Sequence, residues 1–160
     1  MDRTEVYTPP GGMPRVSRPS PQIYKAMGED NVVRMMIDFY RRLETSSIRS
    51  MFPHDMESAA RKSALFFVFL LGGPPLYQQR VGSPMMRARH TPFPIDENAR
   101  LEWMRCFRET LERADELYDF PREHLPGFLE FLDGFSQWMV NTAPNASDDP
   151  GTSLPIAPPS

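Results

Sequence analysis

The chain has 160 residues, of which 40% are hydrophobic, and its formal net charge at neutral pH is -3. This length supports one hydrophobic core and leaves little for a second, so a single domain is expected. The weak negative charge gives no electrostatic reason to expect nucleic acid or an anionic membrane as the main partner. The single cysteine, Cys106, excludes an intrachain disulfide and a zinc site built from several cysteines.

Both ends of the chain differ in composition from its middle. Residues 1–21 and residues 144–160 each contain five of the eighteen prolines. Proline interrupts helices, so we expect two flexible tails around a core of residues 22–143. The N-terminus lacks the apolar centre of a secretory signal, and the longest apolar run, residues 64–71, is too short to span a bilayer. A cytoplasmic protein without a membrane span is therefore expected.

Four segments of the core have the spacing of amphipathic helices. In the first, residues 29–44, and the second, about residues 55–71, apolar side chains recur three or four positions apart. The third covers residues 96–118, with Asp96 as its N-cap. The fourth begins in or just after residues 121–126, because the two prolines there are tolerated only in a first turn. This spacing predicts an all-α protein.

A long irregular segment separates the second and third predicted helices. It reads GGPPLYQQRVGSPMMRARHTPFPI, residues 72–95, and contains four clusters of glycine or proline. A loop of this length inside a compact helical domain is unusual and often carries function. His90 lies in it, after two arginines and before two prolines. We therefore expect the chemistry of the protein in this loop.

The three histidines do not indicate a metal site made by the protein alone. His54, His90 and His124 have no partner residue at the spacing that builds a zinc site on one helix. Cys106 lies in a helical apolar repeat without a nearby base, and no GxSxG motif occurs, so a hydrolase is not indicated. A single histidine can still be the only protein ligand of iron if a haem macrocycle supplies the others.

Haem also needs an apolar slot for its ring and cationic or hydroxyl groups beside its carboxylates. The candidates for the apolar walls are Phe39, Phe66, Phe67, Leu70, Met86, Phe93 and Met104. The candidates for the carboxylates are Arg87, Arg89 and Tyr77. By composition alone, however, a lone histidine is seldom a ligand, and aromatic residues at helical spacing usually form ordinary core.

Four motifs occur together in and after the loop. They are Gly72-Gly73-Pro74, the RxRH of residues 87–90, the PFPI of residues 92–95, and a tryptophan thirteen residues after the histidine. In this combination the chain resembles the second group of truncated haemoglobins, which are compact globins of bacteria and plants. The similarity extends to DFYRRL, MFPHDM and WMVN and covers about residues 24–143. It implies a truncated globin fold, a two-over-two helical sandwich around haem b.

The resemblance assigns roles on both faces of the haem. The histidine of the RxRH motif is the proximal iron ligand of the family, and His90 stands at this position. On the opposite face the family uses a tyrosine and a tryptophan, which match Tyr40 and Trp103. Their O–H and N–H groups can stabilise a bound ligand that gains negative charge. Without the resemblance, both would be interpreted as core aromatics.

Four further positions are implied by the same resemblance. Ala59 matches the gate position, where a small side chain allows ligand entry. Ser63 stands where the family more often has leucine or a longer polar residue, and its small size leaves room for a water molecule. Phe52 matches a phenylalanine that contacts haem, and it cannot donate a hydrogen bond. Ser83 replaces a histidine common among relatives and is interpreted as a turn residue.

The implied function is reversible binding of dioxygen, and of nitric oxide, carbon monoxide or sulfide, at a His90-ligated iron. Strong distal donors hold oxygen firmly, which favours sensing, detoxification or redox chemistry over transport. Turnover as a nitric oxide dioxygenase or a peroxidase would require an external reductase, since no flavin or nicotinamide domain is recognisable. Two alternatives stay open: a haem-free globin-like interaction or regulatory module, and protein binding by the proline-rich tails.

Overall fold

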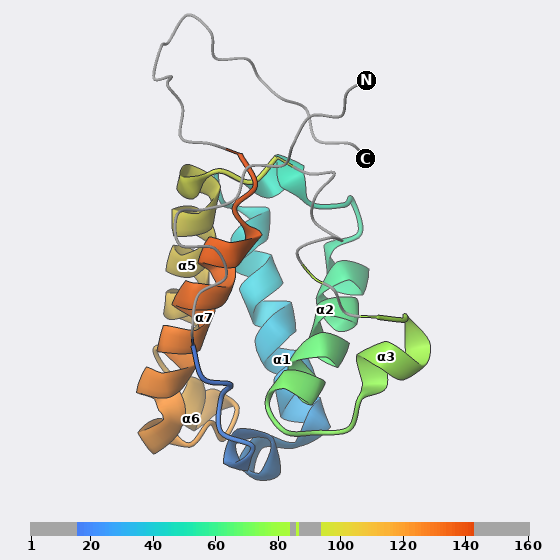
Figure 1. The fold of residues 1–160 in the computed structure, drawn as a ribbon, viewed down its shortest axis with the longest axis vertical. Coiled ribbons are helices and arrows are strands. Elements are labelled where there is room, and N and C mark those ends of the chain that lie inside the picture. Colours follow the sequence, from blue (N-terminus) through green and yellow to red (C-terminus); the bar gives the residue numbers. More distant parts are fainter. Residues whose placement is uncertain (1–15, 84–85, 87–93, 143–160) are drawn as a thin grey trace, which may run out of the picture.

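A computed structural model of the chain describes residues 16–83, 86 and 94–142. In these residues the regular structure is helical (Figure 1), and the all-α prediction is confirmed. The four long helices are α1 (Gln22–Glu44), α2 (Met56–Leu70), α5 (Glu97–Leu111) and α7 (Leu125–Met139). The shorter elements are α3 (Leu76–Arg80), α6 (Ala114–Leu117) and the 3-10 turns Arg49–Met51 and Arg122–His124.

The long helices form two pairs, as expected for a two-over-two sandwich. α1 packs along α2, α5 packs against α7, and contacts between α1 and α5 join the pairs (Figure 1). Phe107 of α5 lies where the pairs meet. Its ring centroid is 4.1 Å from that of Phe39 in α1, 5.7 Å from Phe67 in α2 and 5.8 Å from Phe128 in α7. These aromatic contacts fix the spacing of all four helices at this point.

Aspartates cap the first turns of α2 and α5. The Asp55 carboxylate accepts a hydrogen bond from the backbone N–H of Ser58 at 3.0 Å, and the Asp96 carboxylate accepts one from Ala99 at 2.8 Å. Each carboxylate thereby satisfies a free backbone donor and lies at the positive end of the helix dipole. The N-cap predicted at Asp96 is confirmed.

The structure differs from the sequence prediction at the ends of two helices. α1 begins at Gln22, before the predicted stretch, and contains a kink at Gly28, whose φ is 78°. The predicted third helix is divided, because α5 ends at Leu111 and α6 begins at Ala114. The apolar spacing continues across this break, so spacing alone does not reveal it. The long loop also contains a short helix, α3, that the sequence did not predict.

Residues 16–20, which the sequence assigns to a flexible tail, pack against the helices. Val16 lies so close to Gly134 of α7 that a Cβ there would be 2.5 Å from its Cγ1. Arg18 donates a hydrogen bond to the carbonyl of Phe69 in α2 at 3.2 Å, and its guanidinium lies 4.9 Å from the centroid of that ring. The segment therefore connects α7 with α2. The domain limits expected from the sequence stay a prediction.

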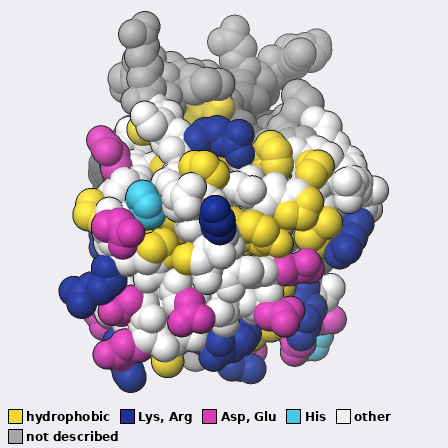
Figure 2. Space-filling model, turned by 90° about the horizontal axis from the view of Figure 1, so that it is seen from below, with side chains coloured by type: hydrophobic (Ala, Val, Ile, Leu, Met, Phe, Trp, Pro, Cys, Tyr) yellow, Lys and Arg dark blue, Asp and Glu magenta, His cyan; other side chains and the backbone are white. Residues whose placement is uncertain are grey.

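The surface of the molecule is mixed in charge. At the end of the bundle that is lowest in Figure 1, acidic and basic side chains alternate over the surface (Figure 2). Ion pairs also form within single helices, such as Arg61 with Glu57 in α2 and Arg105 with Glu109 in α5. Among the described residues, no helix has the length and apolar character needed to cross a membrane. This surface agrees with the weak net charge of the sequence.

Gly72→Ala is expected to lower the free energy of unfolding by about 1–3 kcal/mol. Gly72 has a φ of 110°, and a Cβ at this position would lie 2.5 Å from the Cα of Pro21. Gly127→Ala in α7 is the matched control, because its Cβ would meet no atom within 4 Å and alanine favours the helix. Chemical denaturation measures both values. Equal stability of the two variants would contradict the close approach of Pro21 to Gly72.

Candidate functional site

A cavity of about 370 Å³ lies between the helices of the two pairs. This volume is in the range of small-molecule binding sites. Nine residues predicted from the sequence line it: Tyr40, Phe52, Ala59, Ser63, Phe66, Phe67, Tyr77, Met86 and Trp103. Side chains that are far apart in the sequence therefore meet at one site.

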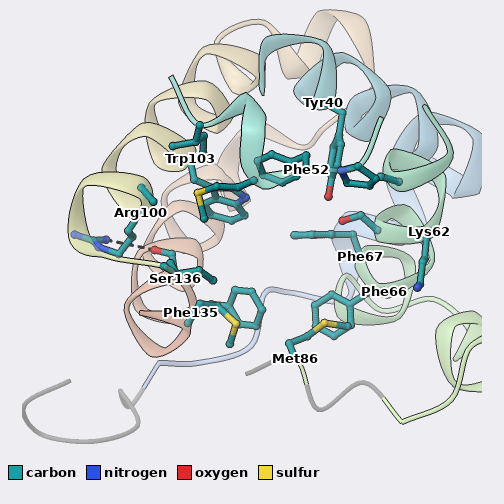
Figure 3. Close-up of a pocket in the computed structure, with 18 of the residues that line it drawn as sticks. Tyr40, Phe52, Lys62, Phe66, Phe67, Met86, Arg100, Trp103, Phe135 and Ser136 are labelled. Carbon is teal, nitrogen blue, oxygen red and sulfur yellow. Dashed lines mark hydrogen bonds between the residues drawn. The ribbon is translucent and has the colours of Figure 1, made fainter. Parts of the chain in front are cut away.

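Two hydrogen-bond donors lie on one side of the cavity. Tyr40 of α1 points its hydroxyl into the cavity, and the Trp103 ring of α5 lies on the same side (Figure 3). Phe39 is buried behind them and does not line the cavity; its ring contacts Tyr40 and Trp103 edge-on at 5.6 and 5.5 Å. Phe52 contacts the Tyr40 ring edge-on at 5.7 Å. These contacts restrict rotation of both donors.

The Ser63 side chain of α2 lines the cavity beside Tyr40. Burial raises the pKa of the Tyr40 hydroxyl above its ordinary value, and the neighbouring Ser63 hydroxyl lowers this pKa by a smaller amount. Tyr40 is therefore protonated at neutral pH and available as a donor. Although serine is shorter than the residue expected from the resemblance, its hydroxyl is near enough to affect the pKa of Tyr40.

The opposite side of the cavity is apolar. Phe66 of α2, Phe135 of α7 and Met86 lie on this side (Figure 3), and the rings of Phe66 and Phe135 stack with their centroids 5.9 Å apart. Phe131 stacks on Phe135 at 5.5 Å, and Tyr77 contacts Phe66 edge-on at 6.1 Å. A slot with an aromatic wall on one side and hydrogen-bond donors on the other fits a planar macrocycle such as haem.

Ten further lining residues were not predicted from the sequence: Ile48, Met51, Pro53, Lys62, Ile95, Ala99, Arg100, Phe135, Ser136 and Met139. Lys62 is exposed beside the cavity, where its ammonium suits a carboxylate. Phe135 and Met139 belong to the apolar repeat of α7, which indicates a buried face without indicating what that face contacts. No local sequence signal distinguishes Arg100 from the exposed arginines of α5.

Four of the predicted site residues, Arg87, Arg89, His90 and Phe93, lie outside the described residues. Their contacts with iron, carboxylates and ring therefore stay predictions. Two other wall candidates, Leu70 and Met104, are buried in the core and do not line the cavity. Met104 follows Trp103 directly, and one residue rotates a helical side chain by about 100°, which turns Met104 away from the cavity.

Comparisons with known proteins agree on one family. The family model for bacterial-like globins matches residues 22–139. Group 2 truncated hemoglobin YjbI of Bacillus subtilis is 38% identical over 119 residues, which cover 74% of this chain and 87% of that protein. Two-on-two hemoglobin-3 of Arabidopsis thaliana is 28% identical over 134 residues, which cover 80% of this chain and 75% of that protein.

Solved structures show the same relationship. Phosphate-bound Hell's gate globin IV aligns with a TM-score of 0.73 at 36% identity, covering 81% of this chain and 80% of that chain. The truncated oxygen-avid haemoglobin from Bacillus subtilis aligns with a TM-score of 0.67 at 33% identity, covering 74% of this chain and 98% of that chain. The fold, the family model and the identities agree with the motifs of the sequence. The chain therefore belongs to the bacterial-like globin family, among the group II truncated haemoglobins.

Proposed function

We propose that the protein binds haem b in the cavity and reversibly binds dioxygen and other small diatomic ligands there. The observation that carries this proposal is the pair of protonated donors, Tyr40 and Trp103, facing an apolar aromatic wall across one cavity. When bound, haem supplies an iron at which such ligands attach reversibly. The Bacillus subtilis relative with a solved structure is an oxygen-avid haemoglobin, which supports the same function for this chain.

In this proposal, three groups of residues would hold the haem. His90 would bind the iron, an assignment that rests on the RxRH motif. Phe52, Phe66, Phe67, Met86 and Phe135, which line the cavity, would pack against the ring. Lys62 pairs with a carboxylate at the edge of the cavity, and Arg87, Arg89 and Tyr77 are further candidates for this role.

Tyr40 and Trp103 stabilise the bound ligand by donating hydrogen bonds to it. A hydrogen bond to a charged acceptor contributes about 1.5–3 kcal/mol, so each donor slows ligand escape roughly ten- to a hundredfold. The Ser63 hydroxyl lines the cavity beside Tyr40 and is a polar neighbour of its hydroxyl. Ala59 is small and lines the same cavity, which leaves space for a ligand to enter beside the donors.

Firm retention of the ligand favours sensing or detoxification of nitric oxide or reactive oxygen species over oxygen transport. Turnover as a nitric oxide dioxygenase or a peroxidase draws electrons from an external reductase in this proposal. The two donors, the apolar wall and Lys62 suit both sensing and detoxification, because both functions need the ligand held beside Tyr40 and Trp103.

Haem binding is tested by the absorption spectrum of the full chain after addition of haem. We expect a Soret band that shifts when carbon monoxide is added to the reduced protein. His90→Ala is expected to remove or alter this band, since the iron loses its protein ligand. His54→Ala and His124→Ala are the controls and are expected to keep it. A wild-type protein without a Soret band would contradict haem binding and favour a haem-free module.

The donor roles are tested by the rate of oxygen dissociation, measured by stopped-flow displacement with carbon monoxide. Tyr40→Phe and Trp103→Phe are each expected to raise this rate roughly ten- to a hundredfold. Tyr118→Phe and Trp138→Phe are the matched controls, because neither residue lines the cavity. Unchanged rates in Tyr40→Phe and Trp103→Phe would show that these residues are core aromatics only.

Ser63→Ala is expected to raise the pKa of Tyr40 further, because the phenolate loses the stabilising effect of the neighbouring Ser63 hydroxyl. A folded-state pKa above the unfolded value makes the native protein less stable as pH rises past about 10, where an unfolded tyrosine titrates. Ser63→Ala extends this loss to higher pH and Tyr40→Phe removes the part of it that comes from Tyr40, whereas Ser47→Ala is the control. NMR titration of the Tyr40 ring carbons and unfolding between about pH 9 and 11 measure both effects. A lowered Tyr40 pKa in Ser63→Ala would contradict this effect of the Ser63 hydroxyl.

A further inference from the structure

Arg100 is the most deeply buried arginine among the ion pairs of the described chain. Its side chain is 9% exposed, whereas those of Arg61, Arg105 and Arg113 are 58%, 50% and 69% exposed. A buried guanidinium costs free energy unless its charge is paired and its N–H groups are satisfied. The surroundings of Arg100 must therefore supply both.

Two carboxylates and a hydroxyl supply them. Nε and Nη2 of Arg100 donate to the two carboxylate oxygens of Glu97 at 2.9 and 2.7 Å. Nη1 donates to Asp133 Oδ1 at 3.0 Å and to Ser136 Oγ at 3.3 Å. The bond from Arg100 to Glu97 is bidentate, which fixes the orientation of the guanidinium as well as its position.

These hydrogen bonds join α5 to α7 across the edge of the cavity. Glu97 and Arg100 lie in the first turn of α5, and Asp133 and Ser136 lie on α7. Arg100 and Ser136 themselves line the cavity, and Figure 3 shows the bond between them at its edge. Trp103 lies three residues after Arg100, hence on the same side of α5.

A second set of hydrogen bonds joins the residues just before α5 to the segment after α7. The Ile95 N–H donates to the Asn141 side-chain carbonyl at 2.9 Å, and the Asn141 N–H donates to the Ile95 carbonyl at 3.0 Å. The Thr142 N–H also donates to the Ile95 carbonyl, at 3.1 Å. These bonds lie before α5 begins, so they do not fix the rotation of its first turn about the helix axis. The bonds of Arg100 to α7 fix this rotation.

The position of Trp103 depends on this rotation. On its inner side the indole contacts Phe39 and Phe107 edge-on, with centroid distances of 5.5 and 5.3 Å. Edge-on aromatic contacts tolerate small shifts, because their energy varies slowly with ring position. A donor that slips by a fraction of an ångström, in contrast, loses much of its hydrogen bond. The ring contacts alone therefore do not fix the indole N–H accurately enough, and the α5 backbone that carries Trp103 must be held in place as well.

We propose that Arg100 is a positioning residue for Trp103: its hydrogen bonds to Glu97, Asp133 and Ser136 fix the first turn of α5 on α7 and hold the indole where a bound ligand can accept its N–H. This inference rests on the proposed function, in which Trp103 donates to the ligand. The inference adds a residue that sets the position of the Trp103 indole through the contact between α5 and α7. In this role Arg100 does not contact the ligand.

Arg100→Lys tests the inference, because lysine keeps the charge and cannot form the bidentate pair. We expect the oxygen dissociation rate to rise about three- to tenfold, as for one weakened hydrogen bond. The C–O stretching frequency of the carbon monoxide complex is expected to move toward that of Trp103→Phe. Asp133→Asn is expected to give a smaller change of the same sign. Arg105→Lys, on the exposed side of the same helix, is the matched control and leaves both quantities unchanged.

A comparison of two backgrounds separates positioning from general loosening of the fold. If Arg100 acts through Trp103, Arg100→Lys raises the dissociation rate in the wild-type background and leaves it unchanged in the Trp103→Phe background. An equal rise in both backgrounds overturns the inference, because the effect then does not pass through the indole. A wild-type rate and C–O frequency in Arg100→Lys overturn it as well.

A measurement without haem distinguishes failure of this inference from failure of the proposed function. In Trp138→Phe protein, Trp103 is the remaining tryptophan, so acrylamide quenching reports on its side chain alone. We expect Arg100→Lys to increase quenching by roughly twofold and Arg105→Lys to leave it unchanged, in line with the loss of buried hydrogen bonds. If the protein shows no Soret band but Arg100→Lys increases quenching, the role of Trp103 toward a haem ligand is rejected. The role of Arg100 in fixing the first turn of α5 on α7 is kept. Unchanged quenching in a haem-binding protein rejects the positioning role alone.

Discussion

The cavity depends on the packing of one ring, Phe107, against an aromatic ring from each of the other three long helices. Phe107 is fully buried, and a close-packed interior resists compression, so the helices cannot approach further at this level. Phe67 and Trp103 both contact Phe107 and line the cavity. These two rings therefore form the boundary between the packed core and the cavity between the helix pairs.

The two sides of this space differ in chemistry, and the difference follows from which helices supply them. α1 and α5 place a phenol and an indole on one side, while α2 and α7 place stacked phenylalanines on the other. Burial keeps the Tyr40 hydroxyl protonated by raising its pKa, so the donor side carries no negative charge. Such an asymmetry suits a planar cofactor that binds its protein ligand on one face and a small molecule on the other.

Helical spacing and capping residues were sufficient to predict the four long helices and the cap at Asp96, because these depend on neighbours in the sequence. The motifs around the loop led to Tyr40, Ser63 and Trp103, which line one cavity. Contacts between distant segments could not be predicted in this way. Arg100 pairs with Asp133, thirty-three positions away, and nothing in the sequence near either residue indicates the partner. The same holds for residues 16–20, whose composition suggests a tail although they pack on α7 and α2.

The most direct test of the central claim is a crystal structure of the full chain reconstituted with haem. We expect the ring inside the cavity, with Tyr40 and Trp103 on one side, Phe66 and Phe135 on the other side, and an imidazole nitrogen of His90 bound to the iron. Haem bound outside the cavity, or an iron ligand other than His90, would contradict the account.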